Sequence, residues 1–117
     1  MLRFAFILAA GLGALLRWGF HHTSLPWPTL IVNVLGSFAI GFLFIYLDRF
    51  SLHYKSLICI AFLGAFTTYS SFSLDIVRWL DQGALKTAAM YFLASNLLSI
   101  GACYVGWMIA KSLVTSS

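Results

Sequence analysis

The chain has 117 residues, of which 62% are hydrophobic and only 9% are charged. A soluble domain of this length needs more surface charge, so the composition excludes a water-soluble protein and indicates one embedded in membrane lipid. Seven lysine and arginine residues against three aspartates give a net charge of +4. This balance suits anions or anionic lipid headgroups, and no basic run interleaved with aromatic residues suggests nucleic acid.

Four segments are long and apolar enough to span a bilayer, which takes about 20 residues of helix. The expected fold is an all-α membrane protein in which residues 1–117 form a single transmembrane domain. We keep the first segment as a retained helix, because no convincing cleavage site of a signal peptide follows it. The four predicted helices cover approximately residues 2–20, 29–47, 57–80 and 84–110.

The first segment combines small residues with a charge. Ala10, Gly13 and Ala14 would let another helix approach closely. Arg17 follows on the Gly13 face, near the end of the apolar run, and allows two interpretations. It is either an interfacial arginine that extends toward the membrane surface beside Trp18, or a charge that attracts anions at the mouth of a pore.

The second segment follows a Pro-Trp-Pro sequence, which suits a helix start at a membrane surface. Thr29, Asn33 and Ser37 recur every four residues and therefore share one face. An asparagine in hydrocarbon must be hydrogen-bonded. Asn33 either bonds a neighbouring helix or donates its amide N–H groups to an anion.

The third segment contains a polar cluster within an apolar run. Residues 64–73 carry five serine and threonine hydroxyls, a tyrosine and two phenylalanines. Such residues compete with the helix for backbone hydrogen bonds, and ion sites form at helices broken inside the bilayer. We predict a break at mid-membrane near Thr67 and Thr68; a continuous helix is the alternative. Asp75 and Arg78 are close enough on one helix to form a partly exposed ion pair.

The fourth segment carries hydroxyl groups at a strict four-residue spacing, which places them on one helix face. They either bond neighbouring helices or form a solvated track, and a stripe of four favours the track. The stripe consists of Thr87, Tyr91, Ser95 and Ser99, with Asn96 beside it.

Lysine and arginine residues divide almost evenly between the two predicted sides, with four against three. Because this bias sets membrane orientation, the chain can insert both ways up and form antiparallel pairs. Four short helices are also little material with which to enclose a pathway, which favours a dimer.

The candidate pathway residues are neutral donors and aromatic rings, and no carboxylate lies in mid-helix. An anion is therefore expected rather than a cation or proton.

Residues 64–73 (Gly-Ala-Phe-Thr-Thr-Tyr-Ser-Ser-Phe-Ser) resemble the third-helix signature of the Fluc (CrcB-type) fluoride channels, Gly-x-x-Thr-Thr-Phe-Ser-Thr-Phe-Ser. Arg17 matches the basic position of that family, residues 33–37 match its second-helix Asn-x-x-Gly, and the fourth-helix hydroxyls match its polar track. The resemblance covers all four helices in order. Tyr69 stands where phenylalanine is usual, which adds a hydroxyl, and Ser71 stands where threonine is common.

The resemblance implies an antiparallel, dual-topology homodimer with two pores, which exports fluoride passively across the bacterial inner membrane. It further implies that Arg17 supplies a vestibule charge. The backbone carbonyls of Gly64 and Thr67 in both subunits would hold a structural Na⁺ ion at the dimer centre. The fluoride pore would be lined by Asn33, Tyr69, Ser71, Phe72, Tyr91, Ser95 and Ser99.

Two other functions are considered, and neither they nor the channel is an enzyme, because the sequence contains no catalytic arrangement. A small dual-topology multidrug or cation exporter shares the length and helix count. It exchanges protons on a glutamate in its first helix, and this chain has no glutamate. In a structural subunit without transport, the hydroxyl stripes would serve packing alone.

Overall fold

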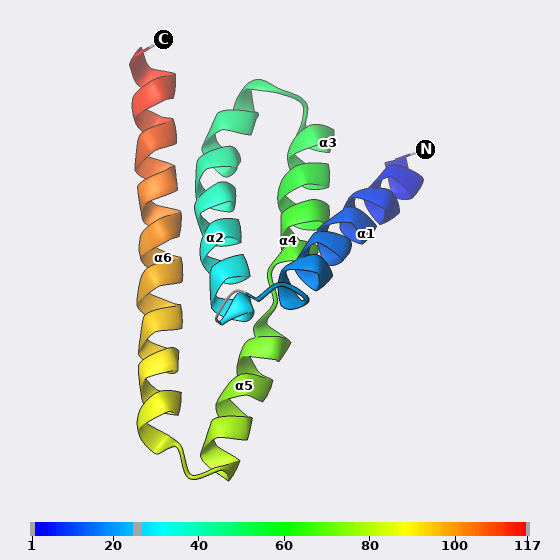
Figure 1. The fold of residues 1–117 in the computed structure, drawn as a ribbon. Helices are drawn as coiled ribbons and strands as arrows, with labels where there is room; N and C mark the ends of the chain where they lie inside the picture. The colour runs from blue at the N-terminus through cyan, green and yellow to red at the C-terminus, as the bar shows by residue number, and fades with distance from the viewer. Residues whose placement is uncertain (1, 25–26, 117) are drawn as a thin grey trace.

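The computed structural model describes residues 2–24 and 27–116. Its helices form four segments that are long and apolar enough to cross a membrane: Leu2–His21, Pro28–Arg49, Leu52–Asp81 and Leu85–Thr115. The prediction of an all-α membrane protein with four spanning segments is confirmed. The start of α1 and the end of α6 lie toward the same end of the molecule (Figure 1), as an even number of spans requires.

The first two spans are α1 (Leu2–His21) and α2 (Pro28–Tyr46), and a 3₁₀ turn, η1 (Leu47–Arg49), extends the second. Pro28 occupies the first turn of α2, where its missing N–H costs nothing because that position has no helical acceptor. The fourth span is the single long helix α6 (Leu85–Ser116). It runs beyond the predicted end at residue 110, because residues 111–115 contain neither glycine nor proline.

The third span is made of four pieces: α3 (Leu52–Lys55), the π-helical segment η2 (Ser56–Phe62), α4 (Leu63–Phe66) and α5 (Tyr69–Asp81). It begins at Leu52 and not at the predicted residue 57, because the Ser51 side chain caps it by accepting a hydrogen bond from the Tyr54 N–H. Between α4 and α5, Thr67 and Thr68 have extended backbone angles. Figure 1 shows α5 leaving the direction of α4 at this point.

The α2–α6 pair forms the most extensive helix contact, and the two helices run side by side in the same direction (Figure 1). Glycines bring the backbones together. A Cβ atom at Gly41 would overlap with the Cys103 carbonyl, and one at Gly106 would overlap with the Phe38 carbonyl.

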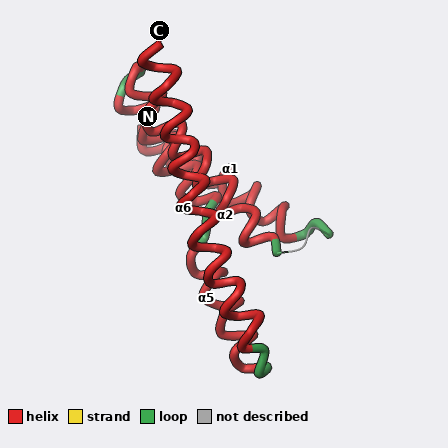
Figure 2. The backbone as a smooth tube through the Cα atoms, turned by 90° about the vertical axis from the view of Figure 1, so that its left-hand side faces the viewer, coloured by secondary structure: helices red, strands yellow, loops and turns green. Residues whose placement is uncertain are grey.

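α1 crosses the third span and packs on η2 and α4. A Cβ at Gly13 would overlap with the Phe62 carbonyl, which confirms the close helix approach expected at this glycine. Seen from the side, α5 and the first turns of α6 continue below the link between α1 and α2 (Figure 2). α1 and α2 both pack against α4, at whose end the third span is interrupted, and a pocket lies beside the interruption.

Candidate functional site

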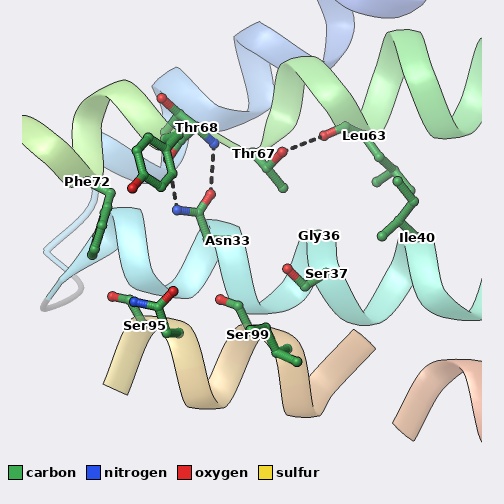
Figure 3. Close-up of a pocket in the computed structure, with 13 residues that line it drawn as sticks. Asn33, Gly36, Ser37, Ile40, Leu63, Thr67, Thr68, Phe72, Ser95 and Ser99 are labelled. Carbon is green, nitrogen blue, oxygen red and sulfur yellow. Dashed lines mark hydrogen bonds between the residues drawn. The ribbon is translucent and has the colours of Figure 1, made fainter. Parts of the chain in front are cut away.

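A pocket of about 260 Å³ lies between α2, the interrupted third span and α6. Figure 3 shows side chains from all three pointing into it. None of these described lining residues is a carboxylate or a cation, and all of the polar ones carry a hydroxyl or an amide. The lining consists of Asn33, Gly36, Ser37, Ile40, Leu63, Thr67, Thr68, Tyr69, Phe72, Ser95, Asn96, Ser99 and Ile100.

Threonine hydroxyls stabilise both helix ends at the interruption. The Thr67 hydroxyl donates to the Leu63 carbonyl at 3.1 Å, which the Thr67 N–H also bonds, at 3.0 Å. The Thr68 hydroxyl caps α5 by accepting from the Ser71 N–H at 3.3 Å, as threonine does at many helix starts. Ser71 itself lies in the first turn of α5 and is not among the residues that line the pocket.

Asn33 connects α2 to the interrupted backbone. Its side-chain N–H donates to the Thr68 carbonyl at 2.8 Å, and its side-chain oxygen accepts from the Thr68 N–H at 2.7 Å (Figure 3). This matches the interpretation in which Asn33 bonds a neighbouring segment. The amide nitrogen carries a second N–H, which leaves a donor for a ligand in the pocket.

The aromatic residues of the predicted pore occupy different environments. The buried Phe72 ring lies 5.6 Å from the Tyr91 ring and 5.4 Å from the Tyr69 ring. Tyr69 is 74% exposed although it lines the pocket, whereas Tyr91 is completely buried. Phe72 thus lies between a buried and an exposed ring.

Tyr91 does not line the pocket, although its spacing places it on the same helix face as Ser95. Its hydroxyl donates to the Asp75 carboxylate at 3.2 Å, and the rings of Trp27 and Trp79 pack against its ring in T-shaped contacts. The sequence predicted an ion pair between Asp75 and Arg78, but among the described residues the two side chains do not form one. Tyr91 takes the carboxylate of Asp75 as its partner.

Ser95 carries an unsatisfied polar group in the pocket. Ser95 is 7% exposed, and its hydroxyl has no hydrogen bond within 3.5 Å among the described residues, although it lies near the Tyr91 hydroxyl. A buried polar group without a partner costs about 1–3 kcal/mol and indicates a place for water or a ligand. Ser99 lies one turn further along the same pocket wall.

Arg17 lies outside the set of residues that line this pocket. It is partly buried, and its Nη1 atom donates to the Ala65 carbonyl in the last turn of α4 at 2.8 Å. Neither interpretation from the sequence foresaw this partner. The apolar lining residues Ile40, Leu63 and Ile100 were also missed, since nothing in their sequence context separates them from other apolar positions.

Gly64 and Thr67 are the two positions whose carbonyls are expected to hold sodium. In a continuous helix these carbonyls would accept from the N–H groups of Thr68 and Ser71. The Thr68 N–H instead donates to Asn33, and the Ser71 N–H donates to the Thr68 hydroxyl. Both carbonyl oxygens therefore lose their regular helical donors, which suits ligands for a hard cation.

These features define a small multi-pass membrane protein with a hydroxyl- and amide-lined pocket at an interruption of a spanning helix. A protein-family model described as "CrcB-like protein, Camphor Resistance (CrcB)" matches residues 4–107. The chain belongs to this family, and it is a multi-pass protein of a bacterial membrane.

Individual relatives agree with the family match. A protein of Rhodospirillum centenum is 39% identical over 114 residues, which cover 89% of this chain and 90% of the relative. A protein of Stutzerimonas stutzeri is 40% identical over 123 aligned positions, which cover 95% of this chain and 99% of the relative. One of Chelativorans sp. is 45% identical over 95 residues, covering 79% and 76%. All three are named "Fluoride-specific ion channel FluC", and the resemblance found from the sequence motifs is confirmed.

Proposed function

We propose that this protein is a fluoride-selective channel through which fluoride leaves the bacterial cytoplasm passively across the inner membrane, relieving fluoride toxicity. The observation that carries the proposal is the pocket beside the interrupted span, which offers hydroxyl and amide donors and no carboxylate among its described lining residues. Carriers of cations or protons usually need an acid at such a place. The names of the relatives supply the identity of the anion.

A small, strongly hydrated anion crosses a membrane only if protein donors replace the water that it loses. Ser95 is a well placed donor, because it lines the pocket and its buried hydroxyl has no hydrogen bond within 3.5 Å among the described residues. Ser99 and the second N–H of Asn33 extend this donor set. The N-terminal turn of α5, which includes Ser71, adds the positive end of a helix dipole.

Aromatic edges serve the same anion. The hydrogen-bearing edge of an aromatic ring is the positive part of its quadrupole, so Phe72 and Tyr69 offer weak attraction without a charge that would trap the ion. Tyr91 has an indirect role, because its ring stacks on the Phe72 ring and fixes the position of that ring. The pathway therefore binds fluoride through many weak donors, which permits rapid passage.

The proposed channel is an antiparallel homodimer with two pores. Its support is the exposure of Tyr69 beside the buried Phe72 and the nearly even division of lysine and arginine residues. A second copy would cover Tyr69 and close the open side of each pathway. Because the two copies are inverted, each of the two pores is built from the same residues in the opposite direction.

The interruption of the third span is proposed to lie near the middle of the bilayer. Fifteen residues of the span Leu52–Asp81 precede Thr67, and 13 follow Thr68. The Gly64 and Thr67 carbonyls, freed from helical hydrogen bonds, are proposed to be ligands for one structural sodium ion together with those of the second copy. Sodium bound there would join the two subunits through oxygen coordination.

The test is efflux of fluoride from proteoliposomes, with chloride efflux measured in parallel and protein-free liposomes as the control. Rapid fluoride release with little chloride release is expected. Release of neither ion, from protein shown to be folded and dimeric, would contradict the proposal and favour a structural subunit without transport.

A further inference from the structure

α1 holds the third span just before its interruption through residues on one helix face. Gly13 lies so close to the Phe62 carbonyl that no side chain fits between the two backbones. One turn later, Arg17 donates to the Ala65 carbonyl at 2.8 Å. Since positions four residues apart share a helix face, the close contact at Gly13 places the guanidinium of Arg17 at the end of α4.

A third contact follows on the same face. The Phe20 ring meets the Phe66 ring edge-on, with 5.8 Å between centroids, at the last residue of α4. The end of α4 is therefore held by a ring contact and by a charged hydrogen bond on successive residues. Together these contacts fix where the backbone leaves the helix.

The Ala65 carbonyl needs an outside donor because of the interruption. In a continuous helix it would accept from the Tyr69 N–H, but Tyr69 begins the next helix, α5. The last four carbonyls of a helix have no partners within it. Leu63 is served by Thr67, and Ala65 is served by Arg17.

The charge of Arg17 also fits this position. Leu52–Phe66 form one continuous helical run, whose C-terminal end carries the partial negative charge of the helix dipole. A guanidinium at membrane depth is costly unless it is paired, and a carbonyl at a helix end is such a partner. The partly buried guanidinium is directed at the backbone.

We infer that Arg17 is a positioning residue of the pathway, which fixes the end of α4 through the Ala65 carbonyl and thereby sets the position of Thr67 and Thr68. This rests on the proposed channel function, but it assigns Arg17 a role other than a vestibule charge. Asn33 holds Thr68 on the far side of the interruption, so the two extended residues are fixed from α1 and from α2.

Three variants separate a positioning residue from a charge that attracts anions. Arg17→Met removes the charge and all donors, and Arg17→Lys keeps a charge and a donor on a similar stem. Arg78→Met is the matched control, because it removes the same charge from an exposed position on α5. Each is tested for fluoride efflux at low and high ionic strength, and for amide hydrogen exchange over residues 63–72 in nanodiscs.

Arg17→Met is expected to lower efflux about tenfold or more at both ionic strengths, and to speed exchange of the Thr67 and Thr68 amides by a similar factor. Arg17→Lys should restore both within about threefold, and Arg78→Met should change both less than about twofold. A loss of flux at low ionic strength alone, with exchange unchanged, would overturn the inference, because screening by salt marks a charge that steers ions. Unchanged flux and exchange in Arg17→Met would overturn it as well.

A second measurement applies if Arg17→Met does not fold. Solid-state NMR of the parent protein in bilayers, with labelled arginine guanidinium nitrogens and alanine carbonyls, should show a direct contact between Arg17 and Ala65. The absence of that contact would overturn the inference. If the parent releases no fluoride, the channel function fails, while hydrogen exchange and the NMR contact still decide the role of Arg17.

Discussion

Asn33 and Thr68 exchange two hydrogen bonds although 35 residues separate them in the sequence. The asparagine amide thus replaces the helical partners that the Thr68 backbone has lost, and it does so from the wall of the pocket. The same side chain holds the backbone at the interruption and lines the pocket, where its remaining N–H is left for a ligand.

Asn33→Asp is expected to abolish fluoride efflux, with a decrease of more than about tenfold. The carboxylate keeps an acceptor for the Thr68 N–H, but it faces the Thr68 carbonyl without a donor and repels an anion. Gln82→Glu makes the same chemical change at an exposed position and serves as the control. Parent-like flux in Asn33→Asp, measured in proteoliposomes, would remove Asn33 from the pathway.

Ser95→Ala is expected to change stability and flux in opposite directions. The Ser95 hydroxyl is buried and has no hydrogen bond within 3.5 Å among the described residues. Its removal should leave the free energy of unfolding unchanged or raise it by up to about 1–3 kcal/mol, and the thermal midpoint should follow. Fluoride efflux should fall, because the pathway loses a donor. Ser112→Ala, at an exposed position on α6, should affect neither property. A clear loss of stability in Ser95→Ala would mean that the hydroxyl is satisfied.

Phe72→Ile should lower the rate of fluoride efflux, since it keeps an apolar side chain but removes the positive ring edge. It also removes the stacking partner of Tyr91. Phe4→Ile, on the exposed side of α1, controls for the loss of a phenylalanine. Equal rates in the parent and in Phe72→Ile would rule out the ring edge as part of the pathway.

Tyr69→Phe should be tolerated, with efflux within about twofold of the parent. The tyrosine ring contacts Phe72, and this contact does not need the hydroxyl. Efflux and thermal midpoint are measured together. If flux is lost while the protein stays folded, the hydroxyl donates directly to the ion or to the second copy.

Gly41→Ala is expected to destabilise the protein by about 1–3 kcal/mol, because its Cβ would overlap with the Cys103 carbonyl. Gly101→Ala is the matched control, since among the described residues no atom beyond its own stretch of α6 backbone lies within 4 Å of a Cβ at that position. The thermal midpoints of the two variants in detergent measure the difference. Equal midpoints would show that α2 and α6 separate easily.

The four spans and several site residues were predictable from the sequence. Apolar runs of sufficient length mark the spans, and the four-residue spacing of Asn33 and Ser37, and of Ser95 and Ser99, brings these side chains to one pocket. Local competition between side-chain hydroxyls and the helix also identified Thr67 and Thr68 as the residues most prone to leave it.

The partners of polar groups were not predictable, because they lie on other helices. Periodicity places Tyr91 in the hydroxyl stripe, but it does not indicate that Asp75 of α5 takes the hydroxyl. Equally, the position of Arg17 near the end of an apolar run suggests the membrane surface. Its actual partner depends on the crossing of α1 over α4, which is set by the contact of Gly13 with a distant carbonyl.

The two contacts between glycine and carbonyl in the α2–α6 pair have a mechanical consequence. Each helix contributes one of the glycines, Gly41 and Gly106, so sliding either helix along the other would bring a larger side chain against a carbonyl. We therefore expect the two helices that carry Asn33, Ser95 and Ser99 to move together as one wall of the pocket. A change in the width of the pocket is then expected at the opposite wall, where the third span is interrupted.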